Sequence, residues 1–278
     1  MKNGLYNGLD NGLHNGGYNG LDNGLRNGLF NNETYQKDID ILNYLNHPNN
    51  KNLTVSDKKK VSEMIKLLKA NNLWSKMIGC YMFLGNSSAS CALNLKNPYQ
   101  FNLTFYGGWV FNNGGLPNGI NAYADTGINS STNLSSTSTH MSYYSTTNNS
   151  GGALMGVDLV SYLLMYLNRN GASYFGVYTS PLRGGIVLSD ISGFWVVSRI
   201  NNTEFFSYNK SVSPPNNYLL YTSEPPKPQD NANIYLAARN EGFASLFSDQ
   251  QCKFASVGQG LTVSECSLLN DIIKNIYS

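Results

Sequence analysis

The chain has 278 residues and a formal net charge of +2, and only 13% of its residues are charged. This composition provides no basic surface for nucleic acid or for an anionic membrane, so neither is an expected partner. No stretch reaches the roughly 18 apolar residues of a membrane-spanning helix, and the N-terminus lacks the apolar run of a secretion signal.

Residues 1–32 form a repeat in which seven Asn-Gly pairs recur every four residues. Glycine and asparagine disfavour a helix, and Asn-Gly is a strong turn signal, so one interpretation is a string of transient turns. In an extended chain, however, side chains four residues apart share one face, which favours a docking peptide or tether for a larger assembly. The docking residues would be the leucines that follow six of the pairs: Leu5, Leu9, Leu13, Leu21, Leu25 and Leu29.

A helical neck is expected over residues 33–76. Its first helix would begin after Asn32 and end near residue 46. Its second helix would be capped by Ser56 and would end at Asn71, because apolar residues recur at helical spacing between these two points.

Residues 77–278 predict an antiparallel β-sandwich followed by a C-terminal helix. Short runs rich in Tyr, Phe, Val, Thr and Ile alternate with Gly, Asn, Ser and Pro, and no helices are regularly interposed. Thr262 and Glu265 have the spacing of a capping box that starts the final helix. The segment 156–168 fits either a buried strand or a short helix. The expected strands are 80–84, 101–106, 119–124, 139–146, 173–178, 184–188, 193–199, 204–208, 217–222, 234–239 and 251–257.

The four cysteines lack both the paired spacing of a zinc site and the density of a disulfide scaffold. We therefore expect buried, reduced thiols at Cys80, Cys91, Cys252 and Cys266. No cofactor or metal is expected. Calcium is an alternative, with Asp125 as its best single ligand; otherwise Asp125 accepts hydrogen bonds from its own turn.

No sequence motif predicts an active site. His14, His47 and His140 have no serine or cysteine signature around them, and no G-x-S-x-G elbow occurs. Glycoside hydrolysis requires two carboxylates about 5 to 10 Å apart, and no two acidic residues of the β-region are near neighbours in sequence. Those residues are Asp125, Asp158, Asp190, Glu204, Glu224, Asp230, Glu241 and Asp249. The chain is therefore not expected to be an enzyme.

The three tryptophans could fill the core or stack on a sugar ring. Trp74 and Trp195 have apolar surroundings and are expected in the core. Trp109 lies beside a loop that contains Asn112 and Asn113, and these three residues are the candidate glycan-binding set. The alternative is that Trp109 also packs in the core.

Three segments predict exposed loops: the polar run 130–140 and the proline-rich segments near residues 212 and 223. Loops at one end of a sandwich are common binding sites. These loops could therefore contact a neighbouring protein or a glycan, or they could be inert connections.

Several segments resemble those of a known group of proteins, in the same order along the chain. They are LWSKMIGCYMFLG, NLTFYGGWVFNNGGLPNGINAYADTGIN, HMSYYSTTN, SGFWVVSRINN and KFASVGQGLTVSECSLLNDII, between about residues 73 and 275. In these segments the chain resembles virion proteins of Bacteroidetes phages, including crAss-like phages, some of which also have N-terminal NGL repeats. The resemblance implies a concanavalin-like or laminin-G-like jelly roll.

The same resemblance implies a virion structural protein, such as a head-fibre, tail-fibre or decorating protein attached to the particle by its repeat. Its partners would be other virion proteins of the capsid, portal or tail, and the protein would be a homo-oligomer. An alternative function is a carbohydrate-binding receptor module of the virion that contacts a host-surface glycan. A glycan hydrolase is the third interpretation.

Overall fold

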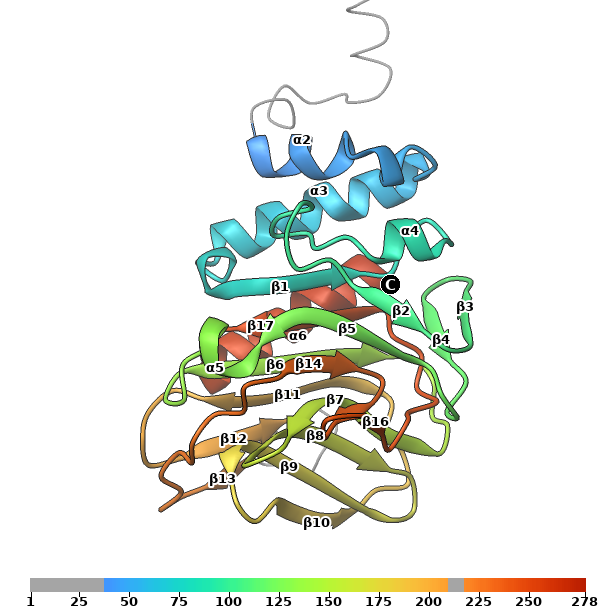
Figure 1. The fold of residues 1–278 in the computed structure, drawn as a ribbon. Coiled ribbons are helices and arrows are strands. Elements are labelled where there is room, and N and C mark those ends of the chain that lie inside the picture. The colour runs from blue at the N-terminus through green and yellow to red at the C-terminus, as the bar shows by residue number, and fades with distance from the viewer. Residues whose placement is uncertain (1–37, 210–217) are drawn as a thin grey trace, which may run out of the picture. The chain divides into compact units, whose positions relative to one another are not determined.

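The structure is a computed structural model that describes residues 38–209 and 218–278. The repeat of residues 1–32, with its six docking leucines, lies outside the described residues, so its docking role stays a prediction. Contacts divide the chain into two units, Met1–Leu42 and Asn43–Ser278. The second unit contains the sheets (Figure 1).

The two longest described helices, α3 and α6, begin at capping boxes. In a capping box the side chain of the cap residue accepts from the amide three residues later, and the side chain of that later residue accepts from the amide of the cap. Thr54 caps α3 by accepting from the amide of Asp57, and the Asp57 carboxylate accepts from the amide of Thr54. The predicted cap at Ser56 is therefore wrong by two residues, whereas the predicted box at Thr262 starts α6. The helices of the described residues are α2 (Ile39–Leu45), α3 (Val55–Ala70), α4 (Ser88–Cys91), α5 (Ser130–Asn133) and α6 (Val263–Tyr277), with 3-10 turns η2 (Pro48–Asn50) and η3 (Trp74–Lys76).

The predicted mainly-β fold is confirmed, because two antiparallel sheets pack face to face as a sandwich of the jelly-roll type (Figure 1). Sheet A has six strands in the described residues. Their order is β1 (Met77–Met82), β17 (Phe254–Gly258), β6 (Thr139–Ser145), β11 (Gly193–Arg199), β12 (Phe205–Tyr208) and β13 (Tyr218–Tyr221).

Sheet B faces sheet A and follows a longer path. Its order is β10 (Arg183–Val187), β9 (Ala172–Thr179), β8 (Tyr162–Asn168), β7 (Gly151–Asp158), β14 (Asn233–Leu236), β5 (Tyr123–Asn129) and β2 (Thr104–Tyr106). Two short strands extend it: β15 (Arg239–Asn240) pairs with β7, and β16 (Ala244–Ser245) pairs with β15. A separate hairpin pairs β3 (Trp109–Phe111) with β4 (Gly115–Pro117).

The core lies between the facing sides of the two sheets, where alternate residues of each strand point inward. Trp195 of sheet A stacks on Phe175 of sheet B with ring centroids 5.9 Å apart. Trp195 is therefore in the core as predicted, and Trp74 is also buried. All four cysteines are buried and free, which confirms the predicted reduced thiols.

The outer face of sheet A is covered by α6, which packs beside α3. The ring of Tyr144 on β6 contacts the ring of Tyr277 on α6 at 5.8 Å. Leu269 and Ile273 of α6 are fully buried. On sheet B, by contrast, alternate residues of β2 and β5 stay exposed or half-buried.

The undecided segment 156–168 contains the end of β7 and all of β8, which pair as an antiparallel hairpin. A strand with one exposed face would alternate apolar and polar residues. This segment does not, because Leu163 and Leu164 point to opposite faces of the sheet and both are fully buried. The expected strand 119–124 is displaced to β5. Before β5, Oδ1 of Asn118 accepts from three following amides and holds this segment in a turn.

No helix within residues 38–209 and 218–278 has both the length and the apolar character that a membrane span requires.

Candidate functional site

Three tyrosines lie side by side on the outer face of sheet B, and we call Tyr106, Tyr123 and Tyr235 the tyrosine row. Tyr106 on β2 pairs with Tyr123 on β5, and their rings stack with centroids 4.7 Å apart and planes 12° apart. Tyr123 is also 4.7 Å from Tyr235 on β14. Tyr106 is 45% exposed and the other two are half-buried. The row is therefore an aromatic surface open to solvent.

Asp125 lies beside the tyrosine row. In the register of the sheet it is opposite Thr104 on β2 and opposite Tyr235 on β14. Its Oδ1 accepts a hydrogen bond from the amide of Gly127 (2.8 Å), and its Oδ2 accepts one from Nδ2 of Asn233 (3.2 Å). The bond to Gly127 is the turn interaction that we expected as the alternative to calcium. Both carboxylate oxygens can accept a further hydrogen bond.

The phenol groups of Tyr123 and Tyr235 stay protonated at neutral pH. Partial burial raises the pKa of Tyr123, and the neighbouring Tyr106 and Asp125 raise it further. Burial also raises the pKa of Tyr235, followed by the effect of the Asp125 carboxylate. Both hydroxyls can therefore donate a hydrogen bond to a ligand.

The predicted glycan-binding residues lie next to the tyrosine row. Trp109 on β3 is half-buried, its ring lies 5.1 Å from the ring of Phe105, and its indole N–H donates to the carbonyl of Tyr123 (3.2 Å). Asn112 and Asn113 are exposed in the turn between β3 and β4. Trp109 thus supports the row from behind, while contact of these three residues with a sugar stays a prediction.

Of the carboxylates considered for catalysis, Asp158 and Glu241 meet at Arg239, whereas Asp125 and Glu204 lie on other elements. Asp158 at the end of β7 pairs with Arg239 (2.8 Å), which also pairs with Glu241. Burial raises the pKa of Asp158 and Arg239 opposes this shift. Glu204 precedes β12 of the opposite sheet and accepts a hydrogen bond from Asn201 (3.1 Å). Asp125, Asp158 and Glu204 are thus held separately by other partners.

A pocket of about 380 Å³ lies where the predicted loop 130–140 meets the end of β17. Its polar groups are hydroxyls and amides, its apolar groups are two aliphatic side chains, and it has no charged or aromatic side chain. The lining residues are Ile78, Thr132, Asn133, Leu134, Ser135, Ser138, Gly258 and Gln259. This pocket could hold an uncharged polar group, but it offers no ring for stacking on a sugar.

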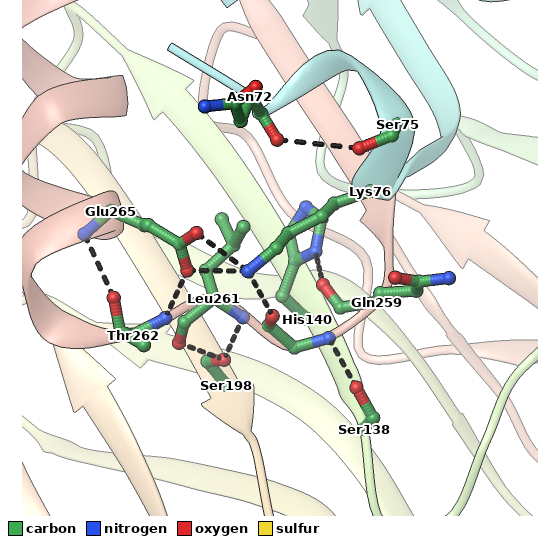
Figure 2. A network of polar contacts seen from close by, with 11 residues as sticks. Asn72, Ser75, Lys76, Ser138, His140, Ser198, Gln259, Leu261, Thr262 and Glu265 are labelled. Carbon is green, nitrogen blue, oxygen red and sulfur yellow. Dashed lines mark hydrogen bonds and ion pairs between the residues drawn. The ribbon is translucent and has the colours of Figure 1, made fainter.

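A network of polar contacts fixes the chain between β17 and α6 (Figure 2), and it includes Ser138 and Gln259 of the pocket lining. Nζ of Lys76 lies 2.6 and 2.7 Å from the two carboxylate oxygens of Glu265. Oγ of Ser198 accepts from the amide of Leu261 (2.8 Å) and donates to its carbonyl (2.7 Å). The side chain of Gln259 points away from this network in Figure 2 and is exposed. The network therefore positions one wall of the pocket.

His140 is the member of this network that lies in buried sheet A, where its Nδ1 is 2.5 Å from the carbonyl of Gln259 (Figure 2). Its Nε2 lies 2.9 Å from Oγ of Ser256, which lies 2.6 Å from Oγ of Ser142. A histidine next to a serine could activate a nucleophile, but all three residues are fully buried. Burial lowers the pKa of His140 to about 4, so the ring is neutral at pH 7. This cluster therefore serves the packing of sheet A.

Sequence reasoning identified Asp125 but missed Tyr106, Tyr235 and Asn233. Each of them occupies an outward position of a short strand, and this alternation was the available signal. Their proximity depends on the pairing of β2 and β5 with β14, which follows them more than 100 residues later in the chain. No three metal-binding side chains cluster anywhere in the described part of the chain.

Neither a family model nor a curated protein matches the chain. Among solved structures it is similar to domain 4 of AbnA, a GH43 extracellular arabinanase from Geobacillus stearothermophilus, in complex with arabinotriose. The identity is 13% and the TM-score 0.48, over 70% of this chain and 98% of that domain.

Two sialidase-related structures are also similar. Trypanosoma rangeli sialidase in complex with sialic acid has 10% identity and a TM-score of 0.48, over 79% of this chain and 40% of the sialidase. The Ruminococcus gnavus IT-sialidase CBM40 bound to alpha2,3 sialyllactose has 14% identity and a TM-score of 0.35, over 48% of this chain and 82% of that module.

Proposed function

We propose that the sandwich is a carbohydrate-binding module and that the tyrosine row is its binding surface. The observation that carries this proposal is the stacked, solvent-open row of Tyr106, Tyr123 and Tyr235 with the Asp125 carboxylate beside it. An aromatic side chain offers an apolar surface to the C–H groups of a sugar, and a tyrosine adds a hydroxyl. Exposed aromatic patches of this kind mark interaction sites.

The polar groups beside the rings suit the hydroxyls of a sugar. Asp125 accepts hydrogen bonds, and the Asn233 amide both donates and accepts. A second pair of amides lies along the same edge of β5, where Nδ2 of Asn129 donates to Oδ1 of Asn231 (3.1 Å). Rings and hydrogen-bonding groups therefore lie on one continuous face.

The test uses the full chain on a glycan array. Each bound glycan is then titrated with tryptophan fluorescence as one readout, since the indole of Trp109, one of the three tryptophans, contacts Tyr123. Tyr106→Ala and Tyr235→Ala should each weaken binding at least tenfold. The matched control is Tyr99→Ala, because Tyr99 is 71% exposed in a loop outside sheet B. Unchanged affinity in both row variants would contradict the proposal.

We also propose that the module binds without cleaving. The support is that Asp125, Asp158 and Glu204 lie on separate elements with partners of their own. Incubation with the bound glycan should release no reducing sugar. Release that disappears in Asp125→Asn, Asp158→Asn or Glu204→Gln would show that the protein is a hydrolase.

The setting that we propose for this module is a bacteriophage particle, to which the N-terminal repeat attaches it. The support is the sequence resemblance to virion proteins and the row of leucines at intervals of four. Changing Leu5, Leu9, Leu13, Leu21, Leu25 and Leu29 together to Ser should prevent incorporation into particles. The control changes the variable positions Asp10, Asp22 and Arg26 to Ser and should be tolerated. Normal occupancy with the leucine-free repeat would refute docking.

A further inference from the structure

We infer that the tyrosine row selects uncharged glycans and rejects glycans that carry carboxylate or sulfate groups, with Asp125 as the selecting residue. This inference rests on the proposed carbohydrate binding and names the class of ligand. It starts from the charges on the surface. Among the outward-facing residues of β2, β5 and β14, Asp125 is the only charged one; the others are Thr104, Tyr106, Tyr123, Gly127, Asn129, Asn233 and Tyr235.

Within residues 38–209 and 218–278, no cation balances the charge of Asp125. Its recorded partners are the amide of Gly127 and the side-chain amide of Asn233, both neutral. No lysine or arginine of the described residues forms an ion pair with it. A half-exposed carboxylate that pairs with no described cation gives the surface beside Tyr123 and Tyr235 a negative potential.

The nearest strands add no positive charge. Arg239 on β15 is engaged by the carboxylates of Asp158 and Glu241, so this cluster has two negative groups for one guanidinium. A site for acidic sugars would instead need a free arginine or lysine, because guanidinium groups bind carboxylate and sulfate through paired hydrogen bonds. Such a group is missing from the outward faces of β2, β5 and β14.

An acidic sugar on the row would therefore meet a like charge beside Tyr123 and Tyr235. Placing like charges together is a common way to exclude a ligand. The hydroxyls of a neutral sugar, in contrast, can donate to the free positions of the Asp125 carboxylate and form charge-assisted hydrogen bonds. The same side chain thus favours one class and disfavours the other.

The experiment compares matched glycans on the full chain. Each neutral glycan that binds on the array is titrated at low salt beside a version of the same backbone that carries one carboxylate or sulfate. We expect the acidic version to bind at least tenfold more weakly, and we expect added salt to narrow the difference because it screens the repulsion.

Asp125→Asn removes the charge while it keeps the size of the side chain. In this variant the acidic and neutral versions should bind within about threefold of one another. Asp190→Asn is the control, because it removes the same charge from an exposed loop before β11 and should leave the discrimination unchanged. The melting temperature of each variant reports whether it is folded.

The outcomes separate the inference from the proposed function. If acidic glycans bind as well as neutral ones, and Tyr106→Ala abolishes both, the row binds sugar but the inference is wrong. Discrimination that survives Asp125→Asn also overturns it. If no glycan binds, or if binding ignores Tyr106 and Tyr235, the proposed function itself fails and the inference fails with it.

Discussion

The two sheets of the sandwich have outer faces of opposite character. The outer residues of β6 and β17 in sheet A are serines, a histidine and aromatic rings, and apart from the half-buried Tyr144, which contacts α6, they are buried. The outer residues of β2 and β5 in sheet B are tyrosines, an aspartate and a threonine, and they stay in contact with solvent. Both faces are thus rich in polar groups, and only one of them is covered by a helix.

This difference implies that the outer face of sheet A contributes to stability and that the outer face of sheet B is available for binding. Beneath α6 the polar side chains must satisfy one another, because an unpaired buried group is costly, and they have no access to a ligand. On sheet B the corresponding groups keep free hydrogen-bonding capacity, and their removal exposes little new apolar surface. Substitutions on the first face should therefore change the free energy of unfolding, and substitutions on the second should change binding.

The largest effect is expected for Ile273→Ala in α6. Ile273 is fully buried, and truncation of a buried isoleucine costs about 2 to 5 kcal/mol through lost burial and the cavity left behind. Urea unfolding of the full chain measures this cost. If the loss is below that of Tyr106→Ala, the contrast between the two faces is wrong.

The next effect is the contribution of His140 to the pH dependence of the free energy of unfolding. An unfolded histidine has a pKa of about 6.5, and burial lowers the pKa in the folded chain to about 4. The unfolded state therefore binds the proton first, so stability is full above about pH 6.5 and falls as the pH drops toward 4. The total loss from this group is about 3 kcal/mol.

Unfolding by urea at several pH values between 7 and 4 measures that loss. His140→Gln should be less stable at pH 7. Its free energy of unfolding should fall less steeply as the pH drops, because glutamine does not titrate. An unaltered slope in the variant would mean that other groups cause the pH dependence.

A smaller effect is expected for Glu265→Gln. The Glu265 carboxylate pairs with Lys76 and accepts from the amide of Thr262 at the start of α6. Both side chains of the ion pair are about one-quarter exposed, so solvent screens the pair, and the change should cost about 1 kcal/mol. Thermal melting of Glu265→Gln beside Lys76→Met measures it. A cost equal to that of Ile273→Ala would contradict this estimate.

The smallest effect on stability is expected for Tyr106→Ala. An exposed cross-strand pair contributes about 0.2 to 1 kcal/mol, so the melting temperature should change little while glycan affinity falls at least tenfold. Unfolding and binding are measured on the same preparation. A large loss of stability with unchanged binding would make the tyrosine row a structural feature.

Features fixed by local chemistry could be predicted from the sequence. The capping box of Thr262 and Glu265 needs only residues three apart, and it starts α6 where expected. The strand 193–199 was predicted with its observed bounds, because a glycine begins it and a run of aromatic and β-branched residues follows. In the same way Asp125 was correctly linked to its own turn.

Features that depend on distant parts of the chain could not be predicted. Leu164 is buried on the face of β8 opposite to the core, which removes the alternation that would have identified the strand. The tyrosine row joins Tyr106 and Tyr123 to Tyr235, more than 100 residues later in the chain. Its existence follows from the register of β14 on β5, which no local pattern encodes.

The pairing of β1 with β17 has a consequence for the synthesis of the chain. Met82 and Phe254 are register partners in this pair. The edge strand β1 is therefore synthesised about 170 residues before the strand β17 with which it pairs. At a translation rate of about 5 to 20 residues per second, that delay is roughly 10 to 35 seconds. During this interval β17 and α6 have not yet been synthesised. The apolar residues of β1 and α3 that pack against them therefore stay exposed. Nascent chains should therefore engage chaperones through this early segment, and they should release them only when α6 has left the ribosome.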